Sequence, residues 1–345
     1  MKNIKERNIS KESFDLAGII TFSLRLVAGW TYFSAFWRRT ILANKLDPEV
    51  PGYIGEKFNH FLPNALGIKP MIEFLVSNPD WLWISMIVFT VIEGIVGLFF
   101  MLGLFTRLMS FGVFSLAFGI LLGSGWIGTT CLDEWQIGIL GIAAGFTIFL
   151  SGGGIYSFDN WLISKRKKIT ATKWFAWLGS GEIPLPIKSL KKFAVAGAII
   201  ILFVSLFTNQ IFHSGLWGTL HNKSVKPKIE ISNASFSDGN LNFTIYRTEG
   251  VDVYGSFLIG ITLTNPNGEK TINIDGNALS SFTERNITNH YVTKVKPGKH
   301  SLIIPLGGKA DITVPTETIE SFSNGTYQLT LTDISGATWV KEIQF

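Results

Sequence analysis

The chain changes its apolar pattern near residue 215, and this change constrains its fold more than any other feature. Before that point lie five apolar stretches of helix length, and after it the sequence turns to short alternating segments. About 20 consecutive apolar residues span the hydrocarbon core of a bilayer, so the first part predicts a bundle of membrane helices. A composition of 47% hydrophobic and only 16% charged residues agrees with a membrane class.

Five transmembrane helices are expected, at 16–37, 81–103, 108–123, 135–150 and 193–212. Lys and Arg are concentrated in the N-terminal tail and between the fourth and fifth helices, and such basic segments stay on the cytoplasmic side. Five crossings then place the C-terminal domain outside the plasma membrane. The expected order is a cytoplasmic tail (1–14), a four-helix domain (15–164) with a long outer loop (38–80), a basic cytoplasmic linker (165–192), a fifth helix (193–213) and an external domain (225–345).

The sequence pattern predicts that the external domain is all-β. Period-two alternation, interrupted by Asn-Gly, Asp-Gly and Pro-Gly turns, predicts eight short strands. Their ranges are 228–231, 240–246, 257–264, 291–295, 301–305, 309–314, 326–331 and 338–344. This number of strands in about 120 residues favours an immunoglobulin-like sandwich. Asn222, Asn233, Asn242, Asn286 and Asn324 each head an Asn-x-Ser/Thr sequon, so they are expected glycosylation sites on an external domain.

Two charged residues fall inside predicted membrane helices. Arg25 lies roughly 14 Å from the inner end of the first helix, and Glu93 lies roughly 15 Å from the inner end of the second, at 1.5 Å per residue. The helices are antiparallel, so the two charges are expected at similar depth. Intramembrane charges are costly and face a partner or a cavity. An Arg25–Glu93 structural ion pair and a role for Glu93 in proton transfer or ligand contact both remain open.

The long outer loop carries cations where the positive-inside trend predicts few. Arg38 and Arg39 follow the first helix, and Lys45 and His60 lie further along the loop. Arginine forks match the geometry of oxyanions, so these residues are candidates for an anion site. The alternative is a set of solvated loop charges, since acidic residues are close in sequence.

Cys131 is the single cysteine of the chain. It lies in the second outer loop, beside Thr129, Thr130 and a glycine-rich turn. A free cysteine is often a small apolar filler, but a thiolate near cations is an effective nucleophile. One thiol excludes an intramolecular disulfide and a Cys-ligated iron–sulfur cluster. His60 is the one histidine before residue 213, which excludes a bis-His haem in the bundle.

A family resemblance rests on two segments. The run EGIVGLFFMLGLFTR (93–107) resembles the second helix of the DoxX/DoxD membrane family, and Arg25 with Gly29 resembles the start of its first helix. Over about 15–162, the long outer loop and the stretch WIGTTCLDEW (126–135) look most like DoxD, taken here as the large subunit of thiosulfate:quinone oxidoreductase. Residues from about 190 to 345 resemble its other subunit, DoxA. The chain thus resembles a DoxD–DoxA fusion.

The resemblance implies oxidation of thiosulfate to tetrathionate outside the cell, with electrons passing to a membrane quinone. Site assignments come from the residues themselves. Cys131 and Glu93 are the catalytic candidates, and Asp133 with Glu134 is a candidate proton supply. Thiosulfate is expected at Arg38, Arg39, Lys45, His60, Trp126, Thr129 and Thr130, and quinone at Arg25, Trp30, Glu93 and Trp135. Quinone is the expected electron acceptor, and no metal, haem or flavin is expected.

Two other functions stay open at this point. A transporter for a sulfur oxyanion would bind its substrate at the same cations of the predicted outer loop, although the sequence shows no inverted repeat. A non-catalytic membrane subunit or scaffold would use the β-domain to bind a partner. The expected partners are thiosulfate, quinone and the bilayer, without nucleic acid. Small residues on the helix faces are compatible with a homodimer.

Overall fold

The computed structural model describes residues 12–128, 133–237, 239–251, 255–316 and 324–344. It divides into two compact units. The first is helical and contains residues 1–51, 84–125 and 132–221; the second contains residues 52–83, 126–131 and 222–345. Each unit is described by itself below.

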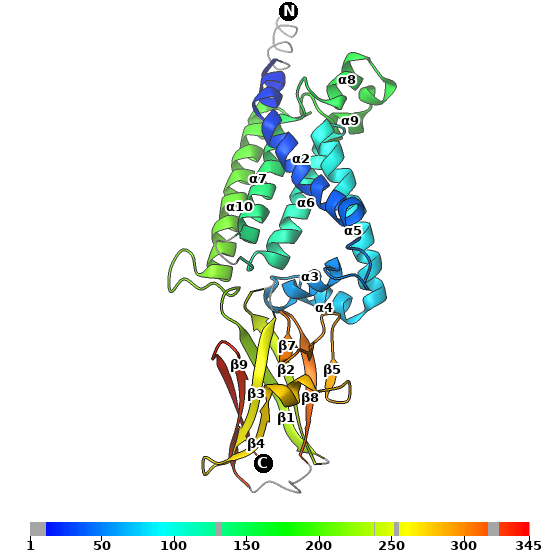
Figure 1. Ribbon diagram of the computed structural model, residues 1–345. Helices are drawn as coiled ribbons and strands as arrows, with labels where there is room; N and C mark the ends of the chain where they lie inside the picture. Colours follow the sequence, from blue (N-terminus) through cyan, green and yellow to red (C-terminus); the bar gives the residue numbers. More distant parts are fainter. Residues whose placement is uncertain (1–11, 129–132, 238, 252–254, 317–323, 345) are drawn as a thin grey trace, which may run out of the picture. The chain divides into compact units, whose positions relative to one another are not determined.

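The long helices of the helical unit are α5 (Pro79–Leu102), α6 (Thr106–Ser124), α7 (Asp133–Ser151) and α10 (Ile187–His213) (Figure 1). Among the described residues, these four are long and apolar enough to cross a membrane. A fifth candidate span is the bent pair Glu12–Ile20 and Phe22–Leu42, whose two parts meet at 53°. All five predicted apolar segments are therefore helical. The first differs from the expectation, because it is broken at Thr21 rather than continuous.

The first span ends in an unusual turn. Helix α2 (Phe22–Trp37) runs directly into a π-helical turn, η1 (Arg38–Leu42). In a π turn the backbone bonds reach one residue further than in an α-helix, and such turns are frequent at functional sites. Thr40 Oγ1 donates to Phe36 O at 2.8 Å across the junction. The turn therefore continues the helix through Arg38 and Arg39.

The segment expected as a basic linker contains folded structure. Helix α8 (Phe158–Ser164), the 3₁₀ turn η3 (Lys168–Ala171) and helix α9 (Lys173–Leu178) follow α7. Arg107, near the start of α6, donates to Gly179 O at 2.9 Å and to Ala176 O at 3.4 Å. Much of 165–192 thus packs on the helical unit, a contact that composition alone did not predict.

The second unit contains two antiparallel sheets around one apolar core. The first sheet has the order β1 (Lys228–Ser237), β2 (Asn240–Glu249), β8 (Lys309–Pro315), β5 (Ile287–Asn289). The second has the order β10 (Thr338–Gln344), β9 (Thr326–Asp333), β3 (Ser256–Thr264), β7 (Leu302–Ile304), β6 (Lys296–Pro297), with β4 (Lys270–Asp275) also paired to β3. A short helix, α11 (Gly276–Ser280), follows β4.

Alternation of buried and exposed residues along the strands explains the apolar core of the second unit. In β9 every second residue is buried, as the period of a strand requires when one face is covered. Leu329 and Leu331 of β9 join Phe243 of β2 and Ile312 of β8 in a single buried cluster. The predicted all-β fold is confirmed. The strand predicted at 291–295 is wrong, because the described backbone there is bent and irregular between β5 and β6, and neither β4 nor β5 was predicted.

The segment predicted as a long outer loop (38–80) belongs largely to the second unit. It contains α3 (Ile54–Phe61), the 3₁₀ turn η2 (Leu62–Asn64) and α4 (Lys69–Ser77). Asn59 Nδ2 donates to Gly307 O at 2.9 Å, and Tyr291 Oη donates to Glu73 Oε1 at 2.8 Å. These helices therefore pack on the β-strands of the same unit.

Candidate functional site

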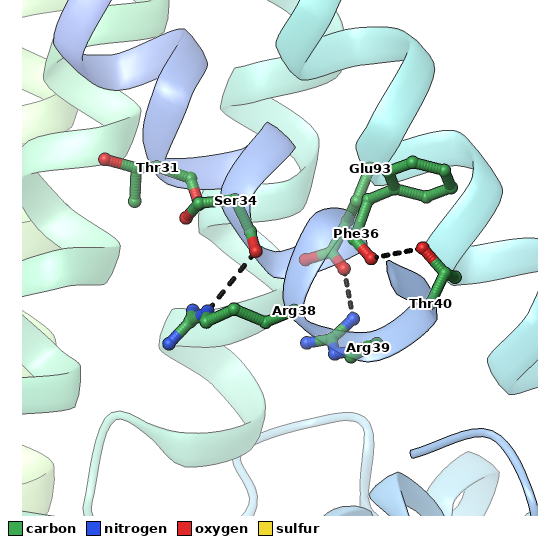
Figure 2. Close-up of polar contacts among 7 residues, drawn as sticks. All are labelled: Thr31, Ser34, Phe36, Arg38, Arg39, Thr40 and Glu93. Atoms are coloured by element: carbon green, nitrogen blue, oxygen red, sulfur yellow. Dashed lines mark hydrogen bonds and ion pairs between the residues drawn. The ribbon is translucent and has the colours of Figure 1, made fainter. Parts of the chain in front are cut away.

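Glu93 forms a buried ion pair with Arg39. Glu93 lies in α5 with a side chain only 3% exposed, and Arg39 of η1 is 17% exposed. Figure 2 shows the guanidinium of Arg39 directed at the Glu93 carboxylate, with a hydrogen bond from Nη1 to Oε2. The Arg39 guanidinium also lies 5.9 Å from the centre of the Phe89 ring. The pair thus joins the end of the first span to the middle of the second.

Arg38, the neighbour of Arg39, is exposed. Its Nε donates to Ser34 O at 3.3 Å, one turn back along α2 (Figure 2). It is also close enough to Glu93 for a charge interaction with that carboxylate. Lys45 lies three residues beyond η1, and its backbone N–H donates to Arg39 O at 3.1 Å. Its side chain is exposed. The turn itself carries two arginines, and the acid bonded to Arg39 is Glu93.

The pairing of Glu93 depends on how closely α2 and α5 pack. A Cβ added at Gly97 would lie 2.4 Å from Phe33 N and 2.7 Å from Gly29 O, closer than real contacts allow. Likewise, a Cβ at Gly94 would meet the Phe36 ring at 2.8 Å. These glycines let the two backbones touch and fix their register. Residues around position 36 of α2 thus face residue 94 of α5, which brings Arg39 to Glu93.

The predicted Arg25–Glu93 pair is wrong. Arg25 is buried, and it donates Nη1 to Gly153 O at 2.6 Å and Nη2 to Tyr156 O at 2.5 Å. A Cβ at Gly103 would lie 2.5 Å from Arg25 Nη1, so Arg25 is level with Gly103. Ten residues of helix separate Gly103 from Glu93, roughly 15 Å. The depth estimate failed because it counted from the ends of apolar stretches, whereas the glycine contacts set the register.

A second buried charge cluster was missed. The Asp159 carboxylate accepts hydrogen bonds from Phe105 N at 2.8 Å, Thr106 N at 2.9 Å and Ser180 Oγ at 2.9 Å. It therefore caps the N-terminus of α6, where orphan amides and the helix dipole favour an anion. Arg107 lies one residue further on and is buried. The signal was present in the Thr106-Arg107 motif, but the partner at position 159 is far away in sequence.

This cluster borders a cavity in the helical unit. Its volume is about 760 Å³, and its lining includes Asp15, Asn160, Phe175, Ser180 and Glu182. The cavity is separate from the Arg39–Glu93 pair, none of whose residues line it. No residue predicted to bind thiosulfate or quinone lines it either.

The predicted quinone residues are not gathered in one place. Trp30 is 54% exposed on α2, and Trp135 of α7 donates Nε1 to Thr208 Oγ1 of α10 at 2.9 Å. Arg25 and Glu93 have separate partners, as described above. Asp133 and Glu134 form the acidic first turn of α7, a position where negative charge favours the helix dipole. The roles of Arg25, Trp30, Glu93 and Trp135 in binding quinone remain predictions. The role of Asp133 and Glu134 as a proton supply also remains a prediction.

The predicted thiosulfate residues divide between the units. Arg38, Arg39 and Lys45 belong to the helical unit, and His60 and Trp126 belong to the second. Trp126 is fully buried and donates Nε1 to Phe61 O at 3.2 Å, which gives it a structural role in that unit. Thr129, Thr130 and Cys131 lie outside the described residues. Within the parts of the chain that the structure describes, no group of three or more His, Cys, Asp or Glu residues could hold a metal ion.

The fold and this site define a class of protein. A helical membrane domain, with a buried carboxylate–arginine pair, is joined in one chain to an antiparallel β-domain.

Comparison with family models then gives the family. Residues 20–186 match the family described as TQO small subunit DoxD, and residues 212–342 match TQO small subunit DoxA. The chain belongs to these families as a DoxD–DoxA fusion, and thereby to the thiosulfate:quinone oxidoreductase subunits. The sequence comparison had taken DoxD as the large subunit, whereas the family description makes it a small one. The DoxD match extends to residue 186, beyond the predicted 162, and so includes α8 and α9.

Proposed function

We propose that this protein oxidises thiosulfate to tetrathionate at the outer face of the plasma membrane and passes the electrons to a membrane quinone. The observation that carries the proposal is the presence of a DoxD-type and a DoxA-type segment in one chain. The exposed Arg38 beside the Arg39–Glu93 pair supports it, since a thiosulfate dianion needs cationic donors at the membrane surface.

The electron balance requires two thiosulfates per quinone. Two thiosulfate dianions join through their terminal sulfurs to give tetrathionate and two electrons, and quinone takes up these electrons with two protons to give quinol. We propose that the Cys131 thiolate first forms a sulfur–sulfur bond to the terminal sulfur of one thiosulfate, and that this step delivers the electron pair to quinone. The terminal sulfur of a second thiosulfate then attacks the same sulfur, releasing tetrathionate and the Cys131 thiolate.

The test is reduction of a short-chain quinone analogue by the purified protein, with thiosulfate or with sulfate as the control anion. Wild-type activity with thiosulfate, at one tetrathionate per quinol, supports the proposal. Loss of this activity in Cys131→Ala supports the covalent step, and retention makes the thiol structural. Absence of activity in the wild type would overturn the proposal, and uptake of labelled thiosulfate into vesicles would then test the transporter.

The outward placement of the β-domain has its own test. Asn324 is exposed, so it is a sequon well placed to carry a glycan, whereas Asn233, although exposed, donates its Nδ2 to Thr244 Oγ1 at 3.3 Å. Asn222 is engaged, because its Nδ2 donates to Gly128 O at 2.7 Å and its Oδ1 accepts from Ser224 N at 3.0 Å. In a glycosylating host, Asn324→Gln should remove one glycan and Asn222→Gln none. A protein without any glycan in such a host would contradict the outward placement.

A further inference from the structure

The η1 turn places two arginines beside one acid, and the two are used unequally. Arg39 is bound to Glu93, whereas Arg38 is exposed and has a long hydrogen bond to a backbone carbonyl. An arginine has five N–H donors. Among the described residues, the hydrogen bond found for the Arg39 side chain is the one to Glu93. Most of the hydrogen-bonding capacity of this turn is therefore available to another acceptor.

The two side chains of the Arg39–Glu93 pair differ in their exposed fraction, whereas in a fully buried ion pair both are inaccessible. Glu93 is almost completely buried, but Arg39 retains contact with the surroundings at 17% exposure. The accessible member of the pair is thus the cation. Its neighbour in the turn, Arg38, is exposed.

The two arginine side chains also indicate a ligand class. Arg38 and Arg39 are neighbours in η1, and each carries a guanidinium group. Planar guanidinium groups bind the oxygens of tetrahedral oxyanions through paired donors.

We propose that Arg38 and Arg39 form a binding site for a dianionic sulfur oxyanion, and that Glu93 is its built-in competitor. Glu93 holds Arg39 while the site is empty, and the arriving anion takes over donors of Arg39 while Arg38 binds it from the exposed side. Glu93 therefore lowers the affinity of the site and favours release of the bound anion. Its role is that of a positioning residue, because it acts through Arg39. The double charge of the anion and its identification as thiosulfate rest on the proposed function.

The proposal is tested by anion binding without quinone. Binding of thiosulfate and of sulfate, which cannot form tetrathionate, is measured by calorimetry on the purified full-length protein. Glu93→Gln keeps the shape of the side chain and removes its charge, so both dianions should bind about tenfold more tightly. Glu93→Asp should restore an affinity close to that of the wild type. Arg38→Gln should weaken binding about tenfold or more, because it removes the exposed half of the site.

Thr40→Val is the matched control. It lies on the same turn and loses a hydroxyl bonded to a backbone carbonyl, but no charge, so anion affinity should not change. Wild-type or weaker dianion binding by folded Glu93→Gln would overturn the competitor role. If Glu93→Gln does not fold, Arg38→Gln decides, since unchanged dianion binding in that variant would overturn the site itself.

Parallel quinone-reduction assays separate the two proposals. Turnover in the wild type without tighter binding in Glu93→Gln would remove only the competitor role of Glu93. Tighter binding without turnover in the wild type would remove the proposed oxidoreductase reaction and leave the anion site in place.

Discussion

Arginines with fixed partners occur at two levels of the helical unit, and the partners are of different kinds. Near Gly103, the buried Arg25 and Arg107 donate to backbone carbonyls, and Asp159 caps the adjacent helix. About ten residues earlier, in α5, the carboxylate of Glu93 accepts a hydrogen bond from the partly exposed Arg39. A carbonyl is fixed by the chain that carries it, whereas a carboxylate side chain can exchange its partner. The comparison suggests that the first cluster stabilises the fold and the second takes part in function.

The largest effect is expected from substitution of Arg107, which tests whether the cluster near Gly103 stabilises the fold. Its side chain is buried and joins α6 to Phe149 O, Gly179 O and Gly181 O. Arg107→Gln should lower stability by about 3–5 kcal/mol, the usual cost of removing one member of a buried charged cluster. Thermal unfolding in detergent measures this loss, with the exposed Lys165→Gln as control. If Arg107→Gln unfolds at the wild-type temperature, the cluster near Gly103 is not a structural clamp.

The second prediction concerns the register of α2 against α5, which decides whether Arg25 or Arg39 reaches Glu93. Gly97→Ala places a Cβ against the backbone of Phe33 and Gly29, so α2 and α5 must move apart, at a cost of about 1–3 kcal/mol. The Arg39–Glu93 pair should be disturbed as well, and anion binding should change with it.

Gly119→Ala is the control for this prediction. Apart from the backbone of its own helix, no described atom lies within 4 Å of a Cβ at Gly119, so anion binding should not change, and stability should not fall, because Ala favours a helix interior over Gly. Equal behaviour of the two variants, measured by thermal unfolding and calorimetry, would show that the glycine contact does not set the register.

The third prediction extends the comparison to the other unit. Tyr291 Oη donates to Glu73 Oε1, a pairing of two side chains like that of Arg39 and Glu93. Tyr291→Phe should therefore cost only about 1 kcal/mol. Hydrogen exchange should detect faster opening of the Val292 amide, which donates to Val76 O at 3.2 Å. Tyr156→Phe, at a 62% exposed position, is the control, and a loss several times larger than 1 kcal/mol would contradict the prediction.

The same contact has a pH dependence. Burial, and then the hydrogen bond to Glu73, raise the pKa of Tyr291 above its ordinary value of 10.0. The folded state therefore keeps this proton when the unfolded chain loses it. The contribution of Tyr291 is fully present below about pH 10 and is lost as the pH rises further. Unfolding of the wild type should become easier above this pH, and Tyr291→Phe should show a smaller change.

The sequence by itself determined the two architectures and the family. A continuous apolar stretch of about 20 residues is helical in a bilayer, because a helix satisfies every backbone group within the segment itself. Alternation with a period of two determined most strands. The motif around Glu93 and Arg107 carried the DoxD resemblance, and the family matches bear it out. Arg38, Arg39 and Glu93 were all selected as site residues from residue type and position, since charges are rare in such surroundings.

Only the tertiary structure decided which charges meet. Arg25 and Arg39 both lie on the first span, and nothing local to the sequence says which of them reaches Glu93. The contact between Gly29 and Gly97 makes that choice, because it fixes the register of two helices whose glycines lie far apart in the chain. The same reason hid the hydrogen bond that Thr106 N donates to Asp159 and the packing of residues 54–77 on the strands of the second unit. Helices and strands follow from local periodicity, but partners depend on packing between distant segments.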